Sequence, residues 1–411
     1  MTTTAPQTPA AYDLLVDRDD VVGYLVGAGY LPRLAASAAQ VGVREVTAGN
    51  MNRVFIASGP LGSLAVKQAP PWVQAVGPEW PIDPNRIASE ARAYAMLADL
   101  APASVPTVDP VDLDRYVLVM EDLSDLDVLR DVLVRQVADV VAGREPASID
   151  FDSLGRVVGR FSAELSLATS VITLDPAAHA ELVVTAANPE LCALTETAVL
   201  DEPYRLNDHN HWIPEMDAAV RALYVDTELL AAVATVREVF ATRAEALIHG
   251  DLHSGSVMIG ERDGVQAIKI FDPEFSFVGP VGMDLGLFWA NLSISAIAAE
   301  RVGATQLAAE RTSAIDASWD EFTAVVSERW PERVGTPDGL DLESWLDRIR
   351  SDAWLFAGVE SIRRTAGFSH AADFTTLPAE QIPAAYRELL ARARTWVVTG
   401  ADVTTTIEGT P

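Results

Sequence analysis

The hydrophobic pattern changes once along the chain, near residue 125, and this change limits the folds that the chain can adopt. Between residues 41 and 68, apolar residues form short alternating runs separated by turn residues, which is typical of β-strands. After residue 125 the apolar spacing is mostly that of helices. A segment of strands followed by a segment of helices predicts an α+β protein, because alternating α/β folds mix the two along their whole length.

The first segment is predicted to be a small lobe with an antiparallel sheet and one main helix. Residues 12–27 have helical spacing, and Asp83 and Pro84 provide a suitable start for the main helix. The predicted strands cover residues 41–46, 54–57, 64–68, 107–112 and 116–121, and the main helix covers residues 84–100. We place the boundary between two domains after residue 122, which gives domains 1–122 and 123–411.

The second segment is predicted to be a larger, mostly helical lobe that contains a single β-hairpin. The predicted helices cover residues 125–142, 152–168, 190–200 and 214–241, with further helices after residue 285. Two short strands, at residues 257–260 and 267–271, flank an Asp-Gly pair at residues 263–264 that is a hairpin signal. Polar residues are concentrated just before and just after this hairpin.

The net charge of −29 limits the partners of the protein. A surface this negative repels nucleic acid and anionic lipid headgroups, so we expect neither as a partner. The one cysteine, Cys192, cannot form an intramolecular disulfide, and the N-terminal residues have no signal-peptide pattern. The chain also has no uncharged apolar stretch of about 18 residues, the length that spans a bilayer. We therefore expect a cytoplasmic protein.

The first candidate catalytic cluster precedes the hairpin. Leu247 and Ile248 run directly into His249, Gly250 and Asp251. An apolar pair followed by His-x-Asp is typical of a catalytic loop, in which the carboxylate accepts a proton from a substrate hydroxyl. When it stands alone, this pattern has a structural histidine as its alternative interpretation.

The second cluster, Asp272 and Glu274, follows the hairpin. We expect these carboxylates, two residues apart in an extended segment, to face the same way. Carboxylates and water molecules suit Mg²⁺, although a solvated turn is the alternative interpretation. The hairpin returns the chain, so Asp251 and Asp272 can border one cleft although they are 21 residues apart. Phosphoryl transfer needs this combination, because one group orients the nucleophile while metal ions bind the phosphate oxygens.

A zinc site is an alternative interpretation of the first cluster, because His249, Asp251 and His253 alternate along the chain. Such a site needs further ligands at a suitable spacing. His209 and His211 are the only candidates nearby, and the residues around them are typical of a polar loop. A metallohydrolase is therefore the less favoured hypothesis.

Only two of the 30 basic residues are lysines, Lys67 and Lys269. Lys67 ends a predicted strand, and Glu90 lies in the predicted helix that follows. A strand lysine held by a helix glutamate is the arrangement by which kinases bind the α- and β-phosphates of ATP. The turn at Gly49 and Asn50 lies between the first two strands, where a phosphate-covering loop belongs. Chance and a solvated surface charge are the alternative explanations of Lys67.

Taken in order, these elements resemble the aminoglycoside/choline kinase group, and within it the S-methyl-5-thioribose kinase family. The matching stretches are residues 49–55, 66–69, 76–81, 120–124, 188–192, 249–256, 272–280 and 362–365. The resemblance implies a bilobal protein-kinase-like fold and the use of ATP and Mg²⁺. It also implies phosphorylation of 5-methylthioribose at the anomeric hydroxyl, a reaction of methionine salvage.

The resemblance further implies a role for each candidate residue. Asp251 is implied as the catalytic base beside the sugar, and Asp272 and Glu274 as the Mg²⁺ ligands. Lys67 and Glu90 are implied to hold the phosphates of ATP. The remaining implied residues are Gly49 and Asn50 in the phosphate-covering loop, Glu121 and Leu123 in the adenine-binding hinge, Trp80 in a loop that closes over the site, and Arg363 and Arg364 near the sugar and the transferred phosphate.

The chain departs from the expected pattern at Ser256, where protein kinases have an asparagine, and this weakens the case for a second metal ion. Residues 47–49 and Ser254 also differ from the family pattern. The open alternatives are a kinase for another 5-substituted ribose such as 5-deoxyribose, an antibiotic or choline kinase, and a nucleotide-binding pseudokinase. The pair Arg363 and Arg364 disfavours a cationic acceptor, and the presence of the implied catalytic residues disfavours a pseudokinase. A homodimer is expected, because the family tends to be dimeric.

Overall fold

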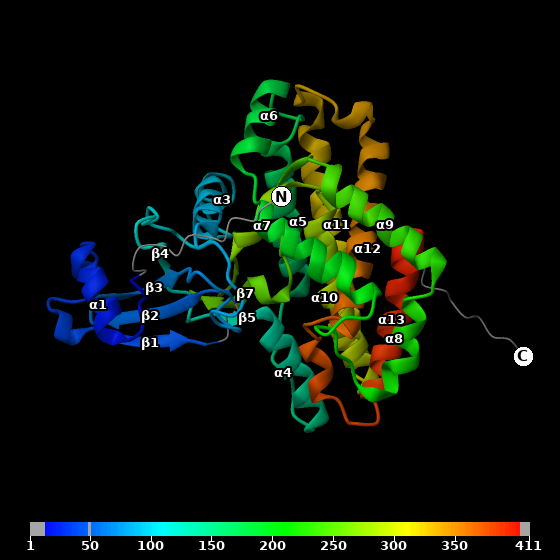
Figure 1. Cartoon of the computed structure of the whole chain (residues 1–411), viewed down its shortest axis with the longest axis horizontal. Coiled ribbons are helices and arrows are strands. Elements are labelled where there is room, and N and C mark those ends of the chain that lie inside the picture. The colour runs from blue at the N-terminus through cyan, green and yellow to red at the C-terminus, as the bar shows by residue number, and fades with distance from the viewer. Residues whose placement is uncertain (1–12, 48–50, 403–411) are drawn as a thin grey trace, which may run out of the picture. The chain divides into compact units, whose positions relative to one another are not determined.

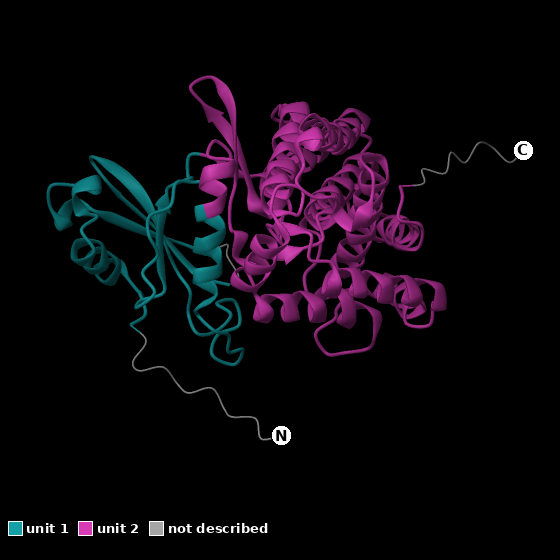
Figure 2. Ribbon diagram, turned by 90° about the horizontal axis from the view of Figure 1, so that it is seen from above, with its two compact units in different colours: residues 1–95, 106–125 teal, residues 96–105, 126–411 magenta. Residues whose placement is uncertain are grey.

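The computed structural model describes residues 13–47 and 51–402, which form two compact units (Figure 1; Figure 2). Unit 1 comprises residues 1–95 and 106–125, and unit 2 comprises residues 96–105 and 126–411. The domain boundary that the sequence places after residue 122 stays a prediction.

Unit 1 is built on a four-stranded antiparallel sheet with the strand order β1-β2-β3-β4. Its elements are α1 (Arg18–Gly27), α2 (Leu31–Leu34), the 3₁₀ turn η1 (Ala38–Gln40), β1 (Gly42–Val46), β2 (Arg53–Gly59), β3 (Gly62–Gln68), α3 (Arg86–Leu100), whose last residues belong to unit 2, and β4 (Val117–Glu121). The meander predicted between residues 41 and 68 is confirmed, because β1 pairs with β2 and β2 with β3, both antiparallel.

One predicted strand, at residues 107–112, is wrong. This segment makes only isolated bridges with β4, from Val108 to Met120 and from Asp112 to Val117. The run contains Pro110, which has no N–H group to donate to a regular ladder. The segment therefore follows β4 without continuous pairing.

The sequence of β4 sorts its side chains between the two faces of the sheet, because successive strand residues point to opposite faces. Val117 and Val119 pack in one core cluster with residues of α1. Leu118 and Met120 pack in a second cluster with residues of α3. Lys67 is directly opposite Leu118 in the strand register, so its side chain lies on the face that α3 covers.

Unit 2 is mostly helical. Its helices are α4 (Leu129–Val141), α5 (Phe151–Thr169), α6 (Pro176–Thr185), α7 (Pro189–Thr195), α8 (Asp217–Leu223), α9 (Thr227–Thr242), α10 (Gly282–Arg301), α11 (Thr305–Arg329), α12 (Leu342–Ala366) and α13 (Ile382–Thr399). Its short turns are the π turn η2 (Glu196–Asp201) and the 3₁₀ turns η3 (Glu202–Tyr204), η4 (Pro214–Met216), η5 (Ser254–Ser256), η6 (Pro273–Phe275), η7 (Trp330–Glu332), η8 (Pro337–Gly339) and η9 (Ala372–Thr376). Its strands are β5 (Asp127–Val128), β6 (Ala246–Ile248), β7 (Val257–Arg262), β8 (Val265–Ile270) and β9 (Phe277–Gly279).

Three predicted helices differ from the observed ones, whereas the helix predicted at residues 152–168 is confirmed as α5. The first begins at Leu129 instead of residue 125, because β5 pairs with β7. The second, at residues 190–200, is helical throughout but changes from α in α7 to π in η2. The third, at residues 214–241, is divided into η4, α8 and α9, because Asp226 caps the start of α9 by accepting a hydrogen bond from the backbone N–H of Leu229.

The helix α10 forms the centre of unit 2, with α11 and α12 packed against it (Figure 1). A glycine allows one of these helices to come very close: a Cβ at Gly286 would lie 2.3 Å from the carbonyl oxygen of Ala353 in α12. By length and composition α10 could cross a membrane, but 100% of its apolar window is buried inside the structure. Its apolar character is therefore explained by its place in the core.

The predicted hairpin is confirmed as β7 and β8. Arg262 lies opposite Val265, so Asp263 and Gly264 form a two-residue turn. Their φ angles are 54° and 77°, and positive φ at both positions is the requirement of a type I′ turn. The hairpin brings the segments before and after it together, because the N–H of Phe271 donates to the carbonyl oxygen of Ser256 at 3.0 Å.

Candidate active site

The loop at residues 249–256, which we call the catalytic loop, begins where β6 ends. The carboxylate of Asp284, in the first turn of α10, accepts hydrogen bonds from the backbone N–H of His249 at 2.7 Å and of Gly250 at 2.9 Å. Burial raises the pKa of Asp284, against the opposing effects of His249 and of these two hydrogen bonds. Asp284 therefore fixes the backbone of the loop to the central helix of unit 2.

Gly250 allows the loop to turn immediately before Asp251. Its φ is 82°, which residues with a side chain rarely adopt. A Cβ at this position would also lie 2.3 Å from the carbonyl oxygen of Phe275. Two independent constraints therefore require glycine between His249 and Asp251.

His249 has a structural role, which removes it from the zinc-site alternative. Its Nδ1 accepts the N–H of Asp251 at 3.3 Å, so its Nε2 carries the proton and donates to the carbonyl oxygen of Phe271 at 3.0 Å. Both ring nitrogens are thus committed to the backbone. His209, another candidate ligand, has its Nδ1 2.8 Å from a carboxylate oxygen of Glu202.

Asp251 is partly open to solvent, with 31% of its side chain exposed. Burial alone would raise its pKa, but His253, Arg363 and Arg364 outweigh burial and hold the pKa of Asp251 well below its usual range. The carboxyl group is therefore ionised at any physiological pH. Asp251, the predicted base, therefore lies close enough to Arg363 and Arg364 for their charges to lower its pKa.

The arginine pair is held by Glu360, a residue that the sequence interpretation missed. The Glu360 side chain has 0% exposure. Its carboxylate accepts from Nε of Arg363 at 2.6 Å and from Nε of Arg364 at 2.8 Å. Arg364 also donates from Nη1 to the hydroxyl of Ser369 at 3.1 Å. The available signal was the spacing, because an acidic residue three and four positions before two arginines faces both of them on a helix.

Replacing Glu360 by glutamine should lower the free energy of unfolding at neutral pH. Removing one partner of a buried ion pair leaves uncompensated charge, and with the amide retaining some hydrogen bonds we expect a loss of about 2–4 kcal/mol. Burial opposes ionisation of Glu360, but Arg363 and Arg364 outweigh it and lower its pKa from 4.5. A lowered folded-state pKa stabilises above about pH 4.5 and loses this contribution as the pH falls further.

Urea unfolding of the wild type and the Glu360→Gln variant at pH 7 and near pH 3.5 checks this expectation. The difference between them should shrink at the lower pH. Glu343→Gln, an exposed change on the same helix, serves as the matched control and should alter stability little. A Glu360→Gln protein as stable as the wild type at pH 7 would show that Glu360 does not hold the pair.

The metal-ligand candidates Asp272 and Glu274 follow β8, but not in the extended segment that the sequence predicted. Asp272 has φ 67° and ψ 47°, the left-handed conformation, and residues 273–275 form the turn η6. One oxygen of each carboxylate nevertheless lies within 4.8 Å of the other. Glu274 is only 3% exposed, and Asn188 anchors this turn by donating from Nδ2 to the carbonyl oxygen of Glu274 at 2.8 Å. Two close carboxylates form a donor set that fits Mg²⁺.

In unit 1 the structure brings Lys67 and Glu90 together. The side chain of Lys67, on β3, lies on the face of the sheet covered by α3, where Glu90 is located. The Lys67 Nζ lies 2.7 Å and 2.8 Å from the two oxygens of the Glu90 carboxylate. Both residues are buried, at 6% and 0% exposure. This is the pair that the sequence predicted for binding ATP phosphates.

The remaining predicted site residues of unit 1 lie on β4 and on loops. Glu121 ends β4 and accepts a hydrogen bond from the N–H of Thr107 at 3.1 Å, and Leu123 is buried just after the strand. The loop of Trp80, between β3 and α3, is tied by a hydrogen bond of 3.0 Å from the N–H of Val73 to the carbonyl oxygen of Trp80. Gly49 and Asn50 lie outside the described residues.

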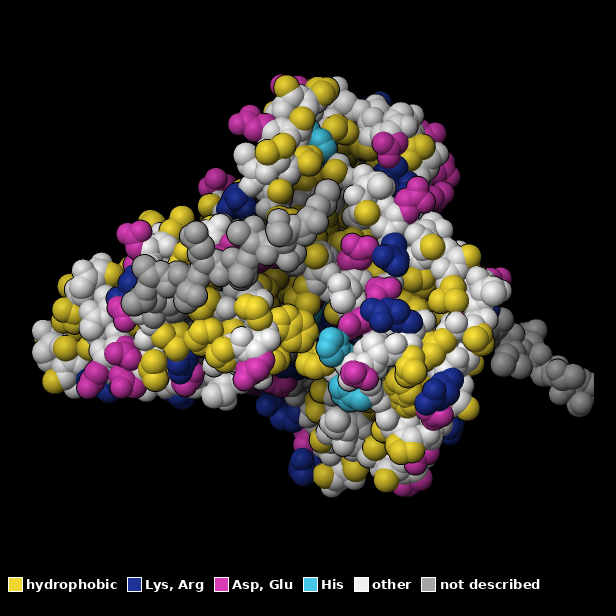
Figure 3. All heavy atoms as spheres, in the orientation of Figure 1, with side chains coloured by type: hydrophobic (Ala, Val, Ile, Leu, Met, Phe, Trp, Pro, Cys, Tyr) yellow, Lys and Arg dark blue, Asp and Glu magenta, His cyan; other side chains and the backbone are white. Residues whose placement is uncertain are grey.

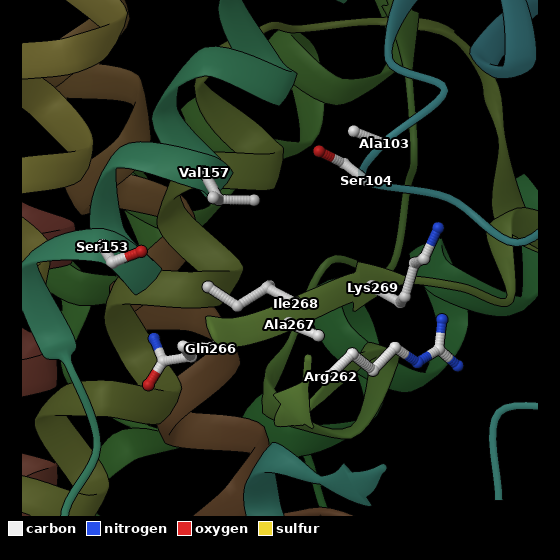
Figure 4. A pocket seen from close by; sticks show the side chains of 9 residues that line it. All are labelled: Ala103, Ser104, Ser153, Val157, Arg262, Gln266, Ala267, Ile268 and Lys269. Carbon is white, nitrogen blue, oxygen red and sulfur yellow. The ribbon is translucent and has the colours of Figure 1, made fainter. Parts of the chain in front are cut away.

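A pocket of about 320 Å³ lies elsewhere in unit 2 (Figure 4). It is lined by Ala103, Ser104, Ser153, Val157, Arg262, Gln266, Ala267, Ile268 and Lys269. None of the predicted site residues lines it, and the Nζ of Lys269 donates to the carbonyl oxygen of Val105 at 2.8 Å. Lys269, which is not assigned to ATP binding, is thus anchored to the backbone of unit 2.

The surface carries the acidic excess that the composition predicts, with acidic side chains spread over the face shown in Figure 3. An anionic substrate therefore meets an unfavourable average field. Arg363 and Arg364 supply local positive charge beside Asp251 within this acidic surface.

Comparison with known proteins gives matches over most of the chain. The model of the phosphotransferase enzyme family matches residues 42–322. A methylthioribose kinase of Geobacillus sp. (strain WCH70) is 34% identical over 371 residues, which cover 89% of this chain and 86% of that protein. A methylthioribose kinase of Cronobacter sakazakii is 33% identical over 359 residues, covering 85% of this chain and 86% of that protein.

Among solved structures, an ethanolamine kinase of Plasmodium vivax aligns with 95% of this chain and 90% of its own, at 9% identity and a TM-score of 0.45. The family match and the two units described above confirm the predicted fold class, which is α+β and protein-kinase-like, with an antiparallel sheet followed by a larger helical part. The chain belongs to the phosphotransferase enzyme family and, within it, to the methylthioribose kinases.

Proposed function

We propose that this protein transfers the γ-phosphoryl group of ATP to the anomeric hydroxyl of 5-methylthioribose, giving the 1-phosphate and ADP, as a step of methionine salvage. The observation that carries this proposal is the grouping of Asp251 with Arg363 and Arg364 in a chain that matches methylthioribose kinases over most of its length. The reaction needs a carboxylate that orients the attacking hydroxyl and positive charge that stabilises the transferring phosphoryl group. The grouping of one carboxylate with two arginines meets both needs.

The residues that surround ATP follow from the same proposal. Lys67, held by Glu90, binds the α- and β-phosphates, and the backbone near Glu121 and Leu123 binds adenine. Asp272 and Glu274 would hold Mg²⁺, which would supply positive charge to the phosphate oxygens. Gly49 and Asn50 belong to the loop over the phosphates, and Trp80 belongs to a loop that closes the site.

The low pKa of Asp251 determines how it contributes. A carboxylate with a depressed pKa is a weak base, and the most effective general base has a pKa near the working pH. Phosphoryl transfer passes through a loose transition state in which the attacking hydroxyl becomes acidic only late. Asp251 therefore acts mainly by orienting the acceptor hydroxyl, and it receives the proton as the new P–O bond forms.

The arginine pair favours a neutral acceptor over a cationic one. Glu360 carries one negative charge against the two positive charges of Arg363 and Arg364, so this group has a net charge of about +1 beside Asp251. Positive charge stabilises the transferring phosphoryl group and repels the ammonium groups of choline or of an aminoglycoside. We further propose that the enzyme acts in the cytoplasm. The expected homodimer stays a prediction.

The test is the rate of ADP release from Mg-ATP with five acceptors: 5-methylthioribose, 5-deoxyribose, ribose, choline and kanamycin. We expect the highest kcat/KM with 5-methylthioribose and no release above background with choline or kanamycin. A preference for 5-deoxyribose would keep the chemistry and change the substrate. ATP binding without turnover on any acceptor would favour the pseudokinase alternative.

A further inference from the structure

We propose that His253 is a positioning residue that orients the carboxylate of Asp251 toward the acceptor hydroxyl. The inference rests on the proposed function of Asp251 and adds the residue that directs it. His253 lies two positions after Asp251 in the catalytic loop, and its side chain is only 15% exposed. Which nitrogen of this imidazole carries the proton is set by the hydrogen bond that the other nitrogen makes.

The hydrogen bonds of His253 fix its tautomer. The ring Nδ1 accepts the backbone N–H of Gly255 at 2.7 Å, so in the neutral ring the proton is on Nε2. Nε2 faces the Oδ2 atom of Asp251 at 3.4 Å. That distance is long for a hydrogen bond, and catalytic hydrogen bonds of this kind tighten when substrate binds. The N–H group therefore points at the carboxylate that it would orient.

Gly255 fixes the plane of the imidazole ring. A Cβ at Gly255 would lie 2.3 Å from Cε1 and 2.8 Å from Nδ1 of His253. The ring thus lies directly against the glycine backbone, and a side chain at position 255 would force the ring to move. Glycine here serves the orientation of a neighbouring side chain as well as the turn η5.

The backbone of Asp251 is restrained by the same loop. Its carbonyl oxygen accepts the N–H of His253 at 2.9 Å and the hydroxyl of Ser256 at 2.8 Å. The backbone of Asp251 is fixed and its Oδ2 atom faces His253. Its Oδ1 atom is then left to accept a hydrogen bond from the sugar hydroxyl. Only one rotation of the carboxylate then satisfies both partners, which is the preorganisation that orientation requires.

The experiment is a double-mutant cycle between His253→Leu and Asp251→Asn, measured as kcat with saturating Mg-ATP and 5-methylthioribose. His253→Leu should lower kcat by about 10- to 100-fold, the range for a hydrogen bond to a charged group, and change both KM values by less than about threefold. In the Asp251→Asn background the same change should cost less than about threefold, because its partner is absent. A merely structural histidine would cause equal losses in both backgrounds.

Three further variants keep the test decisive. His253→Gln retains an amide N–H and should recover much of kcat, and Gly255→Ala should reproduce the loss by displacing the ring. His179→Leu, which removes a histidine contact with the carbonyl oxygen of Glu245, is the matched control and should leave kcat unchanged. Thermal melting and nucleotide binding establish that each variant is folded.

Equal losses in both backgrounds, or an unchanged kcat in His253→Leu, would overturn the positioning role. A normal kcat in Asp251→Asn alone would instead overturn the proposed function of Asp251, so the two failures are distinguishable.

Discussion

Replacing Asp251 by asparagine should lower kcat with 5-methylthioribose by about 10²- to 10⁴-fold, the range for loss of a positioned acid–base group. The amide has nearly the same shape, but it cannot accept the proton of the acceptor hydroxyl, and it removes the negative charge next to Arg363 and Arg364. KM for ATP should change by less than about threefold, because phosphate binding is assigned to Lys67. Steady-state kinetics of purified wild type and variant measure both constants.

Asp263→Asn is the matched control for this variant. Asp263 is exposed in the hairpin turn, where asparagine also tolerates the positive φ. Its kcat should equal that of the wild type. If Asp251→Asn kept more than about a tenth of the wild-type kcat, the role of Asp251 would be wrong whatever its position.

Replacing Asp272 by asparagine should reduce activity at about 1 mM Mg²⁺ by roughly 100-fold or more, since a metal ion that stabilises charge on a transferring phosphoryl group would be worth several kcal/mol. The backbone makes this change unusually clean. Asp272 has φ 67°, and asparagine is as suited to the left-handed region as aspartate. The loss can therefore be attributed to the missing charge and not to strain.

The expected signature is a changed metal dependence. The Mg²⁺ concentration for half-maximal activity should rise strongly in Asp272→Asn, and Glu261→Gln, an exposed change on β7, should leave it unaltered. A removal of Mg²⁺ with EDTA should abolish turnover in the wild type. An unchanged Mg²⁺ titration in Asp272→Asn would exclude Asp272 as a metal ligand.

Local chemistry in the sequence was enough to predict much of the fold. The Asp-Gly pair at residues 263–264 located the hairpin, because few other residues adopt positive φ at both turn positions. The alternating apolar runs between residues 41 and 68, separated by turn residues, located the meander. The pairing of Lys67 with Glu90 was predicted from their places on a strand and on the next helix, and the register puts Lys67 on the face that α3 covers.

Two local features that hydrophobic periodicity does not reveal decided where predicted elements are interrupted. The segment at residues 107–112 has the composition of a strand, yet Pro110 prevents a continuous ladder with β4. The helix predicted at residues 214–241 has unbroken apolar spacing, yet it is divided where Asp226 caps a new start. Hydrophobic periodicity shows which residues face the core. It does not show where a side chain forms a hydrogen bond with the backbone and so ends a helix or strand.

The candidate site shows the same division. Asp251, Asp272 and Glu274 were identified because each lies at a recognisable position around the hairpin. Glu360 was missed although its spacing from Arg363 and Arg364 was visible in the sequence, and the approach of His253 to Asp251 depends on the turn of the catalytic loop. The left-handed backbone of Asp272 was also invisible to the sequence, since aspartate adopts that conformation only where the surrounding turn imposes it.

Phosphorus NMR of the product formed from Mg-ATP and 5-methylthioribose shows directly which hydroxyl receives the phosphoryl group. We expect one new phosphomonoester, coupled to the proton and carbon of the anomeric position, formed in equal amount with ADP. A phosphate on any other hydroxyl of the sugar, or ATP consumed with release of inorganic phosphate and no sugar phosphate, would contradict the proposed function.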